Sequence, residues 1–516
     1  MSRFRRTIHG VASSYVLLAA TAVYSLASVP IALHYLDKER FGLWALMSAL
    51  VGYLSLIDAG MTGSAGRLII DHKDDRDSGR YGGFIKTVVA VTLIQGLIIF
   101  LTGLVFAGLF GRWLAIPEDL QPEFIRLMIL QCSVVALGFA TRIFSLMLGG
   151  HQRMDLVNYA GTLSLAVNFV ALWIYFHFGF GVLSLAWAAF YSTVVNVVCQ
   201  WIACGVLGFF PRRGSWGRVS WIHFREIFDF GKDLFLVNVG WQLIMASQTI
   251  IITRMLGLPA AAVWSVGLRA FNLVMQVIWR LSDMSGPAFA EMMVRGEIVR
   301  LRERYRAMAM LTASLSGFAA VSFALCNSLF VPLWTHGKIQ WPVLNDLLLG
   351  AWMMVLAMQR CHSALVLLTK KIGFLRYVYF MEGAVFVTLA LLVSRRGGLP
   401  AIIACSIVCS AVFSGAYSTW RVSRYLDLSF SAVVRWMRHA GVVLLGFAPP
   451  ALLCWWATHG LEMLPRLAIA SALAATWGLF VLLRFGVPPE LQAEFQKRAP
   501  ARVGPLLARI FGRSEG

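Results

Sequence analysis

The sequence predicts an all-α integral membrane protein with about 14 transmembrane helices. Composition is the first reason: of the 516 residues, 59% are hydrophobic and only 14% are charged. The mean hydropathy of +0.72 is also far from that of a soluble protein. Finally, apolar runs of about 18 residues or more recur along the whole chain, and each can cross a hydrocarbon core of about 30 Å as a helix.

The predicted spans follow one another along nearly the entire chain. They cover 11–35, 42–64, 84–110, 122–148, 157–178, 181–208, 233–256, 260–282, 306–330, 343–368, 375–394, 399–420, 438–459 and 463–485. The first stretch follows Arg3, Arg5 and Arg6, as in a signal peptide, but it is too long and lacks a small-residue cleavage site. We therefore interpret it as a retained first span.

The distribution of basic residues predicts the orientation, because Lys and Arg favour the cytoplasmic side of short loops. With the N-terminus inside, most of the 45 Lys and Arg residues fall on the cytoplasmic side. The opposite side carries Lys38, Arg40, Arg112, Arg254, Lys338, Arg395, Arg396 and Arg466. Both termini are therefore predicted to be cytoplasmic. The formal net charge of +20 reflects this topology and attraction to anionic lipid, so no nucleic-acid partner is expected.

Five arginines fall within predicted spans and direct the search for a functional site. They are Arg126, Arg142, Arg269, Arg280 and Arg360. A charge at the bilayer centre costs about 2.5–3.5 kcal/mol, so such residues normally face protein or a water-filled cavity. His362 follows Arg360 closely and is expected to be a hydrogen-bonded packing residue.

A polar stripe runs along the eighth predicted span and just beyond its end. It consists of Arg269, Asn272, Gln276, Arg280 and Asp283, which share one face of a helix because they recur at helical spacing. We favour a stripe that lines a cavity, because a structural seam rarely needs a second arginine without a nearby acid. The alternative is a buried seam in which Arg280 pairs with Asp283 one turn away.

Two further spans carry polar faces. Asn238, Gln242, Thr249 and Thr253 are spaced to lie on one face of the seventh span, and Gln131, Gly138, Arg142 and Ser145 do so on the fourth. Small hydroxyl residues alone are more typical of helix packing than of a transport path. The candidate cavity residues are therefore Arg142, Arg269, Arg280, Arg360, Asn238, Gln242, Asn272 and Gln276.

A weak internal repeat relates the two halves of the chain. "HYLDKERFGLW" (34–44) and "RMLGLPAAAVW" (254–264) each end a span, cross a short external loop and begin the next span. The alignment places Leu36 with Leu256 and Trp44 with Trp264. It is compatible with parallel repeats whose two bundles face each other across a midplane site.

Three longer segments carry a resemblance to a known family: residues 35–69, 230–257 and 266–292. Their recognisable points are "FGLW" (41–44), "DAG" (58–60) and Pro287. The chain resembles the polysaccharide-transporter branch of the multidrug/oligosaccharidyl-lipid/polysaccharide (MOP) superfamily, and within it the Wzx-type O-antigen flippases. The resemblance covers spans one to nine directly and the remainder by topology.

This resemblance implies two pseudo-symmetric six-helix lobes around a central cationic cavity, with two additional C-terminal helices. The expected ranges are 1–210 for the N-terminal lobe, 211–232 for a cytoplasmic linker, 233–420 for the C-terminal lobe, 421–485 for the additional helices and 486–516 for a cytoplasmic tail. The basic segment 295–306 is expected to be a solvated or lipid-surface stretch between the lobes.

The resemblance also implies a function, which the residues of the stripe can serve. Such a flippase moves a polyprenyl-pyrophosphate-linked oligosaccharide to the outer leaflet of the bacterial inner membrane, for O-antigen or exopolysaccharide biosynthesis. Guanidinium groups bind phosphate through two parallel hydrogen bonds, and amides can bind glycan hydroxyls. The expected partners are the lipid-linked oligosaccharide, membrane lipids and, as a further option, polysaccharide polymerase and assembly proteins.

Other function classes remain open at this stage. An ion-coupled multidrug exporter of the same superfamily would use cavity acids, for which Asp58, Asp283 and Glu382 are candidates, with Asp58 and Asp283 preferred for ion coupling. A structural partner of a glycan-assembly complex is a third option. An enzyme is not expected, because the external loops are too short for a catalytic domain, so no catalytic residue or cofactor is assigned. The cluster "DHKDDRD" (71–77) is interpreted as a solvated loop and not as a metal site.

Overall fold

The computed structural model describes residues 3–75, 79–369, 373–498 and 511, and every regular element within these ranges is helical. It contains 13 helical segments that are long and apolar enough to cross a membrane. One of them, Leu375–Tyr425, is 51 residues long and contains Gly398 in a non-helical conformation (φ 59°, ψ −150°). This break separates the predicted spans 375–394 and 399–420. The predicted all-α membrane fold with about 14 spans is therefore confirmed.

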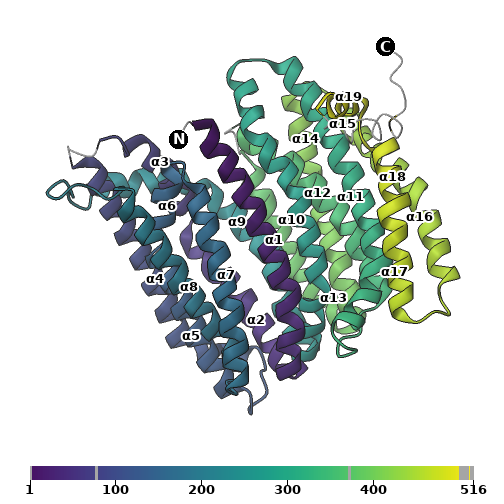
Figure 1. Cartoon of the computed structure of the whole chain (residues 1–516), viewed down its shortest axis with the longest axis horizontal. Helices are drawn as coiled ribbons and strands as arrows, with labels where there is room; N and C mark the ends of the chain where they lie inside the picture. The colour runs from purple at the N-terminus through teal and green to yellow at the C-terminus, as the bar shows by residue number, and fades with distance from the viewer. Residues whose placement is uncertain (1–2, 76–78, 370–372, 499–510, 512–516) are drawn as a thin grey trace. The chain divides into compact units, whose positions relative to one another are not determined.

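The chain divides into two compact units, which we describe separately: unit 1, Met1–Ser265, and unit 2, Val266–Gly516. In Figure 1 the helices of unit 1 run from purple to teal, and those of unit 2 run from teal to yellow. The boundary falls within a single helix, α10. The lobe and linker ranges given above stay predictions.

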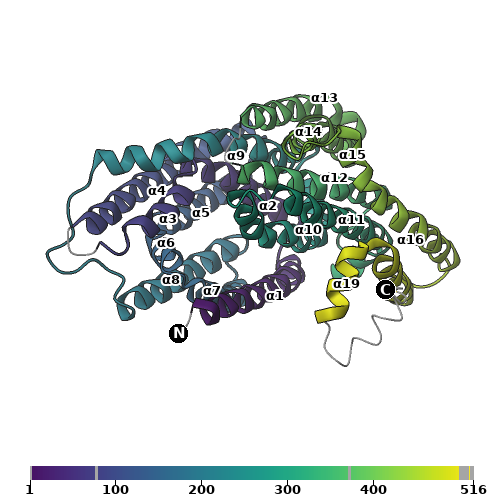
Figure 2. The same cartoon turned by 90° about the horizontal axis from the view of Figure 1, so that it is seen from above.

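Unit 1 is built from nine helices and the beginning of a tenth within the described residues. They are α1 (Arg3–Tyr35), α2 (Lys38–Leu54), α3 (Met61–His72), α4 (Arg80–Trp113), α5 (Gln121–Ala140), α6 (Ile143–Gly150), α7 (Met154–His177), α8 (Leu183–Val206) and α9 (Trp221–Leu256), after which α10 begins at Leu258. Helix α4 packs against α5, α7 packs against both α8 and α1, and α2 packs against α9. Figure 2 shows α1, α7 and α8 side by side.

Two predicted spans of unit 1 are broken helices. Helix α2 continues into a 3₁₀ turn, Ser55–Asp58, and then stops because Ala59 and Gly60 both have left-handed backbone conformations (φ 48° and 74°) before α3 begins. The predicted span 122–148 is split into α5 and α6 at Thr141 and Arg142. Each break brings backbone ends and polar side chains into the interior of the unit.

Glycines allow close helix approaches at two places in unit 1. A Cβ on Gly42 of α2 would lie 2.0 Å from the carbonyl oxygen of Leu258, so only glycine fits there. A Cβ on Gly60 would lie 2.7 Å from the carbonyl oxygen of Gly231, which fixes the break after α2 against α9. These contacts explain two of the points that carried the family resemblance, "FGLW" and "DAG".

Unit 2 contains most of α10 (Leu258–Val294) and the remaining helices. They are α11 (Ile298–Trp334), α12 (Val343–Leu368), α13 (Leu375–Ser410), α14 (Ala416–Tyr425), α15 (Phe430–Val434), α16 (Arg438–Ala457), α17 (Met463–Leu473), α18 (Leu479–Val481) and α19 (Pro489–Arg498). A π-helical turn at Ala411–Gly415 joins α13 to α14, and a 3₁₀ turn at Arg435–Met437 joins α15 to α16. Two further π-helical turns, Ala474–Gly478 and Leu482–Gly486, flank α18.

Helices α11 and α12 form the centre of unit 2. More than half of the apolar stretch of each helix is buried, and α11 packs against α12, α16 and α17. Phe271 of α10 stacks on Trp352 of α12 at a ring separation of 5.4 Å. The basic segment 295–306 is not an open loop. Most of it forms the first turns of α11, where Leu301 and Tyr305 are fully buried and Arg300, Arg304 and Arg306 are exposed. The segment is therefore an amphipathic part of a helix.

Candidate functional site

The helix breaks of unit 1 bring together a partly buried ion pair. Arg142, between α5 and α6, places Nη1 3.0 Å from Asp58 Oδ1, at the end of the 3₁₀ turn after α2. The same nitrogen donates to Thr62 Oγ1 at 2.7 Å, and the Thr62 hydroxyl donates to Asp58 Oδ1. The Arg142 guanidinium also lies 3.9 Å from the centre of the Phe139 ring. The pair is therefore held by a hydroxyl and an aromatic face as well as by charge.

This geometry changes the interpretation of both residues. The sequence assigns Arg142 to substrate binding and Asp58 to ion coupling, whereas the structure places them in contact, with side chains 27% and 21% exposed. The prediction that Gln131 and Arg142 share one continuous helix face is wrong, because α5 ends at Ala140. An anionic substrate at Arg142 would compete with Asp58 for the guanidinium.

The polar stripe of α10 lies on an outward face of the helix. Asn272, Gln276 and Asp283 are exposed, and Arg269 and Arg280 are half-buried. The opposite face is apolar and buried through Phe271, Met275 and Ile278. Exposure of amides and charges to lipid would be energetically unfavourable for a helix within a candidate span. This face is therefore suited to a water-filled space.

One carboxylate of the stripe is paired with an arginine from another helix. Asp283 Oδ1 accepts a hydrogen bond from Arg360 Nη2 of α12 at 3.0 Å, with both side chains nearly half exposed. The Arg360 guanidinium lies 5.9 Å from the centre of the Trp279 ring. The seam alternative paired Asp283 with Arg280. In the structure Asp283 is paired with Arg360 instead.

The predicted polar face of α9 is divided between an exposed and a packed part. Asn238 is exposed, whereas Gln242 packs toward α2, with its Oε1 atom 3.2 Å from the position of a Cβ on Gly52. Thr253 is buried, and its hydroxyl donates to the carbonyl of Thr249 in the same helix. The two threonines thus serve helix packing, and only Asn238 and Gln242 remain candidates for substrate contact.

Unit 2 contains a buried carboxylate that the sequence analysis missed. Asp346 of α12 is fully buried and accepts hydrogen bonds from Trp341 Nε1 at 2.6 Å and from Asn327 Nδ2 at 2.8 Å. The Trp341 ring packs where a side chain on Gly267 of α10 would otherwise lie. An acid four positions into an apolar span was the available signal, but its partners come from α11 and the loop before α12.

A second buried carboxylate, Glu382 of α13, was noted in the sequence as one of few membrane acids. It accepts a hydrogen bond from the backbone N–H of Ser414 at 3.2 Å, and the Ser414 hydroxyl accepts one from Gln359. His362 is also buried and forms a 2.7 Å hydrogen bond with the hydroxyl of Tyr305. The prediction that His362 is a hydrogen-bonded packing residue is confirmed.

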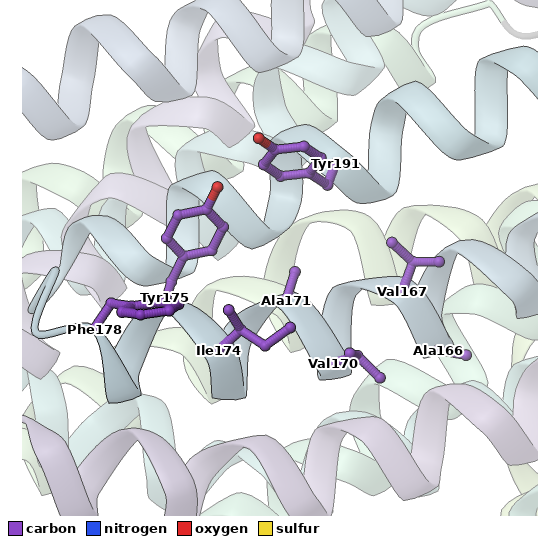
Figure 3. A pocket seen from close by; sticks show the side chains of 8 residues that line it. All are labelled: Ala166, Val167, Val170, Ala171, Ile174, Tyr175, Phe178 and Tyr191. Carbon is purple, nitrogen blue, oxygen red and sulfur yellow. The ribbon is translucent and has the colours of Figure 1, made fainter.

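Unit 1 also has an apolar pocket that could contact lipid. A pocket of about 520 Å³ lies on α7 and α8, lined by Ala166, Val167, Val170, Ala171, Ile174, Tyr175, Phe178 and Tyr191 (Figure 3). Val170 and Phe178 are 55% and 71% exposed. The pocket has no cationic side chain, so it is suited to acyl chains and not to a phosphate group.

Within the described ranges, no group of three or more His, Cys, Asp or Glu residues is arranged to hold a metal ion.

Residues 34–339 match the protein family described as "Polysaccharide biosynthesis protein". The chain belongs to this family. The match begins just before "FGLW", covers both helix breaks of unit 1 and ends after α11, so it includes the ion pair and the whole polar stripe. No curated protein sequence matches the chain.

Solved structures of MOP-superfamily transporters share the fold of this family member. An inward-facing multidrug resistance MATE family transporter is 17% identical, with a TM-score of 0.64, and the match covers 79% of this chain and 95% of that one. A MOP superfamily transporter from Pyrococcus furiosus is 16% identical, with a TM-score of 0.60 over 82% and 96% of the two chains. The lipid II flippase MurJ in an inward closed conformation is 9% identical, with a TM-score of 0.64 over 92% and 99%. At these identities the likeness describes the fold alone.

Proposed function

We propose that this family member is a flippase for a polyprenyl-pyrophosphate-linked oligosaccharide. It would move the head group from the cytoplasmic to the outer leaflet of a bacterial plasma membrane, for cell-surface or exopolysaccharide assembly. Membership of a polysaccharide biosynthesis family supports a glycan substrate. The single observation that carries the proposal is the outward polar stripe of α10, residues 269–283, within a helix long enough to span the membrane.

The stripe has the chemistry that the head group needs. Arg280 and Arg269 lie about three helical turns apart on one face, a spacing of about 16 Å. Guanidinium groups stay charged and bind phosphate oxygens in pairs, whereas the exposed amides of Asn272 and Gln276 can exchange hydrogen bonds with sugar hydroxyls. The polyprenyl chain can remain in lipid, so only the head group requires a polar path.

For Arg142 and Arg360 we infer a role by exchange of partners, since each has a carboxylate at 3.0 Å. We propose that the pyrophosphate competes with Asp58 for Arg142 and with Asp283 for Arg360. A carboxylate released in this way could take up a cation or a proton, which keeps Asp58 and Asp283 as candidates for ion coupling. Asn238 and Gln242 of α9 would contribute further glycan contacts in unit 1.

The alternative is an ion-coupled multidrug exporter. One observation favours it: Asp346 and Glu382 are buried carboxylates without an arginine or lysine in ion-pair contact among the described residues. Acids of this kind can bind cations. The flippase proposal explains the polar stripe better, because a cationic drug would be repelled by Arg269 and Arg280.

The test uses proteoliposomes that contain the purified full chain and a fluorescent polyprenyl-pyrophosphate oligosaccharide. Arg280→Ala and Arg269→Ala are each expected to reduce flipping at least tenfold per inserted molecule, which corresponds to about 1.4 kcal/mol of lost binding. Lysine at either position should restore only part of the activity, because it keeps the charge and loses the paired hydrogen bonds.

The matched control is Arg126→Ala, which removes an exposed arginine of α5 outside the stripe and should flip at the rate of the unchanged protein. Near-normal flipping by both stripe variants would contradict the proposal. Uptake of a cationic dye in the same vesicles, driven by a proton or sodium gradient and lost in Asp346→Asn, would favour the exporter.

A further inference from the structure

A basic pocket of about 320 Å³ lies in unit 2, where α11 begins and where the short helix α15 leads into α16. Its charged side chains are Arg302 and Arg306 from α11, Arg435 from the 3₁₀ turn before α16, Arg438 from the start of α16, and one acid, Glu303. His439 completes the polar lining. Four arginines and one carboxylate in a concave site produce a strong local positive potential.

Two carboxylates of neighbouring segments that do not line the pocket are paired with other arginines. Glu494 lies 2.7 Å from Arg304, and Glu297 lies 3.0 Å from Arg300. Within the part of the chain that the structure describes, none of the four pocket arginines forms an ion pair. Among the lining residues Glu303 offsets part of the charge of the four arginines, and the pocket keeps a net positive charge.

Arg302 provides a second, independent indication of a missing anion. Its Nη2 atom donates to the carbonyl of Leu426, which limits the movement of the guanidinium. Its Nε atom is buried and has no acceptor among the described residues. A buried charged donor without an acceptor is unfavourable, and an oxygen of a bound anion could accept its hydrogen bond.

The remaining lining shows that the ligand has an apolar part. Met310, Leu428, Ala432 and Trp436 line the same pocket, and the buried Trp436 ring lies 6.0 Å from the ring of Tyr305. The pocket also lies at the first turns of two candidate spans, Ile298–Trp334 and Phe430–Ala457, and therefore near the level of a membrane surface. A Trp beside arginines at this level is typical of contacts with lipid head groups.

We propose that this pocket binds the phosphate group of an anionic phospholipid. The arginines would bind the phosphate oxygens and the apolar residues would contact the glycerol region. The predicted topology places the pocket on the cytoplasmic side, where anionic lipids can reach it. The lipid would hold the beginning of α11, the central helix of unit 2, against the α15–α16 segment. This site is separate from the polar stripe of α10 and does not depend on the proposed function.

The test compares the full chain in nanodiscs of phosphatidylcholine with and without phosphatidylglycerol. Phosphatidylglycerol should raise the melting temperature of the unchanged protein and remain bound during native mass spectrometry. Each lost arginine is expected to weaken phosphatidylglycerol binding about fivefold, so Arg306→Gln with Arg438→Gln should weaken it about 25-fold. Both side chains are exposed, so the double variant should melt normally in phosphatidylcholine alone.

The matched control is Arg304→Gln, which removes an arginine of the same helix that does not line the pocket. It should bind phosphatidylglycerol as the unchanged protein does. Equal binding by the double variant and the control would overturn the proposal. A second arm adds inorganic phosphate to the protein in phosphatidylcholine nanodiscs: stabilisation of the same size that depends on Arg306 and Arg438 would assign the pocket to a free phosphate and overturn the lipid assignment. If the double variant melts at a lower temperature in phosphatidylcholine, the single variant Arg435→Gln replaces it in the test. It is expected to bind phosphatidylglycerol about fivefold more weakly, and unchanged binding would overturn the proposal.

Discussion

Asp58 of unit 1 and Asp346 of unit 2 are both carboxylates within candidate membrane spans, yet their surroundings differ. Asp58 is 21% exposed and has the Arg142 guanidinium at 3.0 Å, at a point where two helices break. Asp346 is fully buried in an unbroken helix, and it accepts hydrogen bonds from the neutral donors Trp341 and Asn327. One unit accommodates an acid by pairing it with a cation, and the other by surrounding it with neutral donors.

This difference has an energetic consequence. Removing one member of an ion pair leaves the other charge without its partner, and this loss exceeds the net contribution of the pair. Removing the charge of an acid that has only neutral partners leaves no cation behind. The same substitution, aspartate to asparagine, should therefore have different effects in the two units.

The largest effect is expected for Asp58→Asn, because it leaves Arg142 without its carboxylate. The free energy of unfolding should fall by about 2 kcal/mol, less than for a fully buried pair because both side chains are partly exposed. A dye that reacts with newly exposed thiols can follow melting, since Cys132 and Cys204 are buried in unit 1. Asp58→Asn combined with Arg142→Gln should recover part of the loss. A double variant that is less stable than either single variant would contradict the pairing.

A smaller effect, within about 1 kcal/mol, is expected for Asp346→Asn. The asparagine oxygen can still accept hydrogen bonds from Trp341 and Asn327, and no cation loses its partner. Cys361 and Cys409, both buried in unit 2, report on melting in the same assay. A loss as large as that of Asp58→Asn would remove the contrast between the units and indicate that Asp346 holds a bound cation.

The smallest effect on stability, about 0.5 kcal/mol or less, is expected for Asp283→Asn. Asp283 and Arg360 are 46% and 45% exposed, so water can replace either partner when the pair is broken. The same melting assay measures this variant, with the unchanged protein in the same detergent as reference. A loss above 1 kcal/mol would mean that the pair is shielded from water and belongs with Asp58 and Arg142.

The sequence was sufficient to predict the spans and the polar stripe, because both depend on local periodicity. Hydropathy identifies helices by their length, and Arg269 through Asp283 share a face that follows from 3.6 residues per turn. The same reasoning fails at Arg142, since it assumes a continuous helix and α5 ends two residues earlier.

The partners of the charged residues could not be predicted in this way. Arg142 meets Asp58 from another broken helix, and Asp283 meets Arg360 from α12 rather than the nearer Arg280. Asp346 depends on Asn327 and Trp341, which reach it through the packing of α11 and the following loop. Each pairing is set by tertiary packing, and no periodic pattern in one helix contains that information.

The contact between Gly42 and Leu258 has a consequence for biosynthesis. The carbonyl of Leu258 occupies the space beside Gly42, and the two residues are separated by most of unit 1 along the chain. During synthesis, α2 enters the membrane long before Leu258 leaves the ribosome. The face of α2 that carries Gly42 is therefore without its packing partner during this time. A helix that lacks its packing partner during synthesis can associate with other helices prematurely. Replacement of Gly42 by alanine would therefore act at a late step of folding, because the added Cβ would prevent the first residues of α10 from packing against α2.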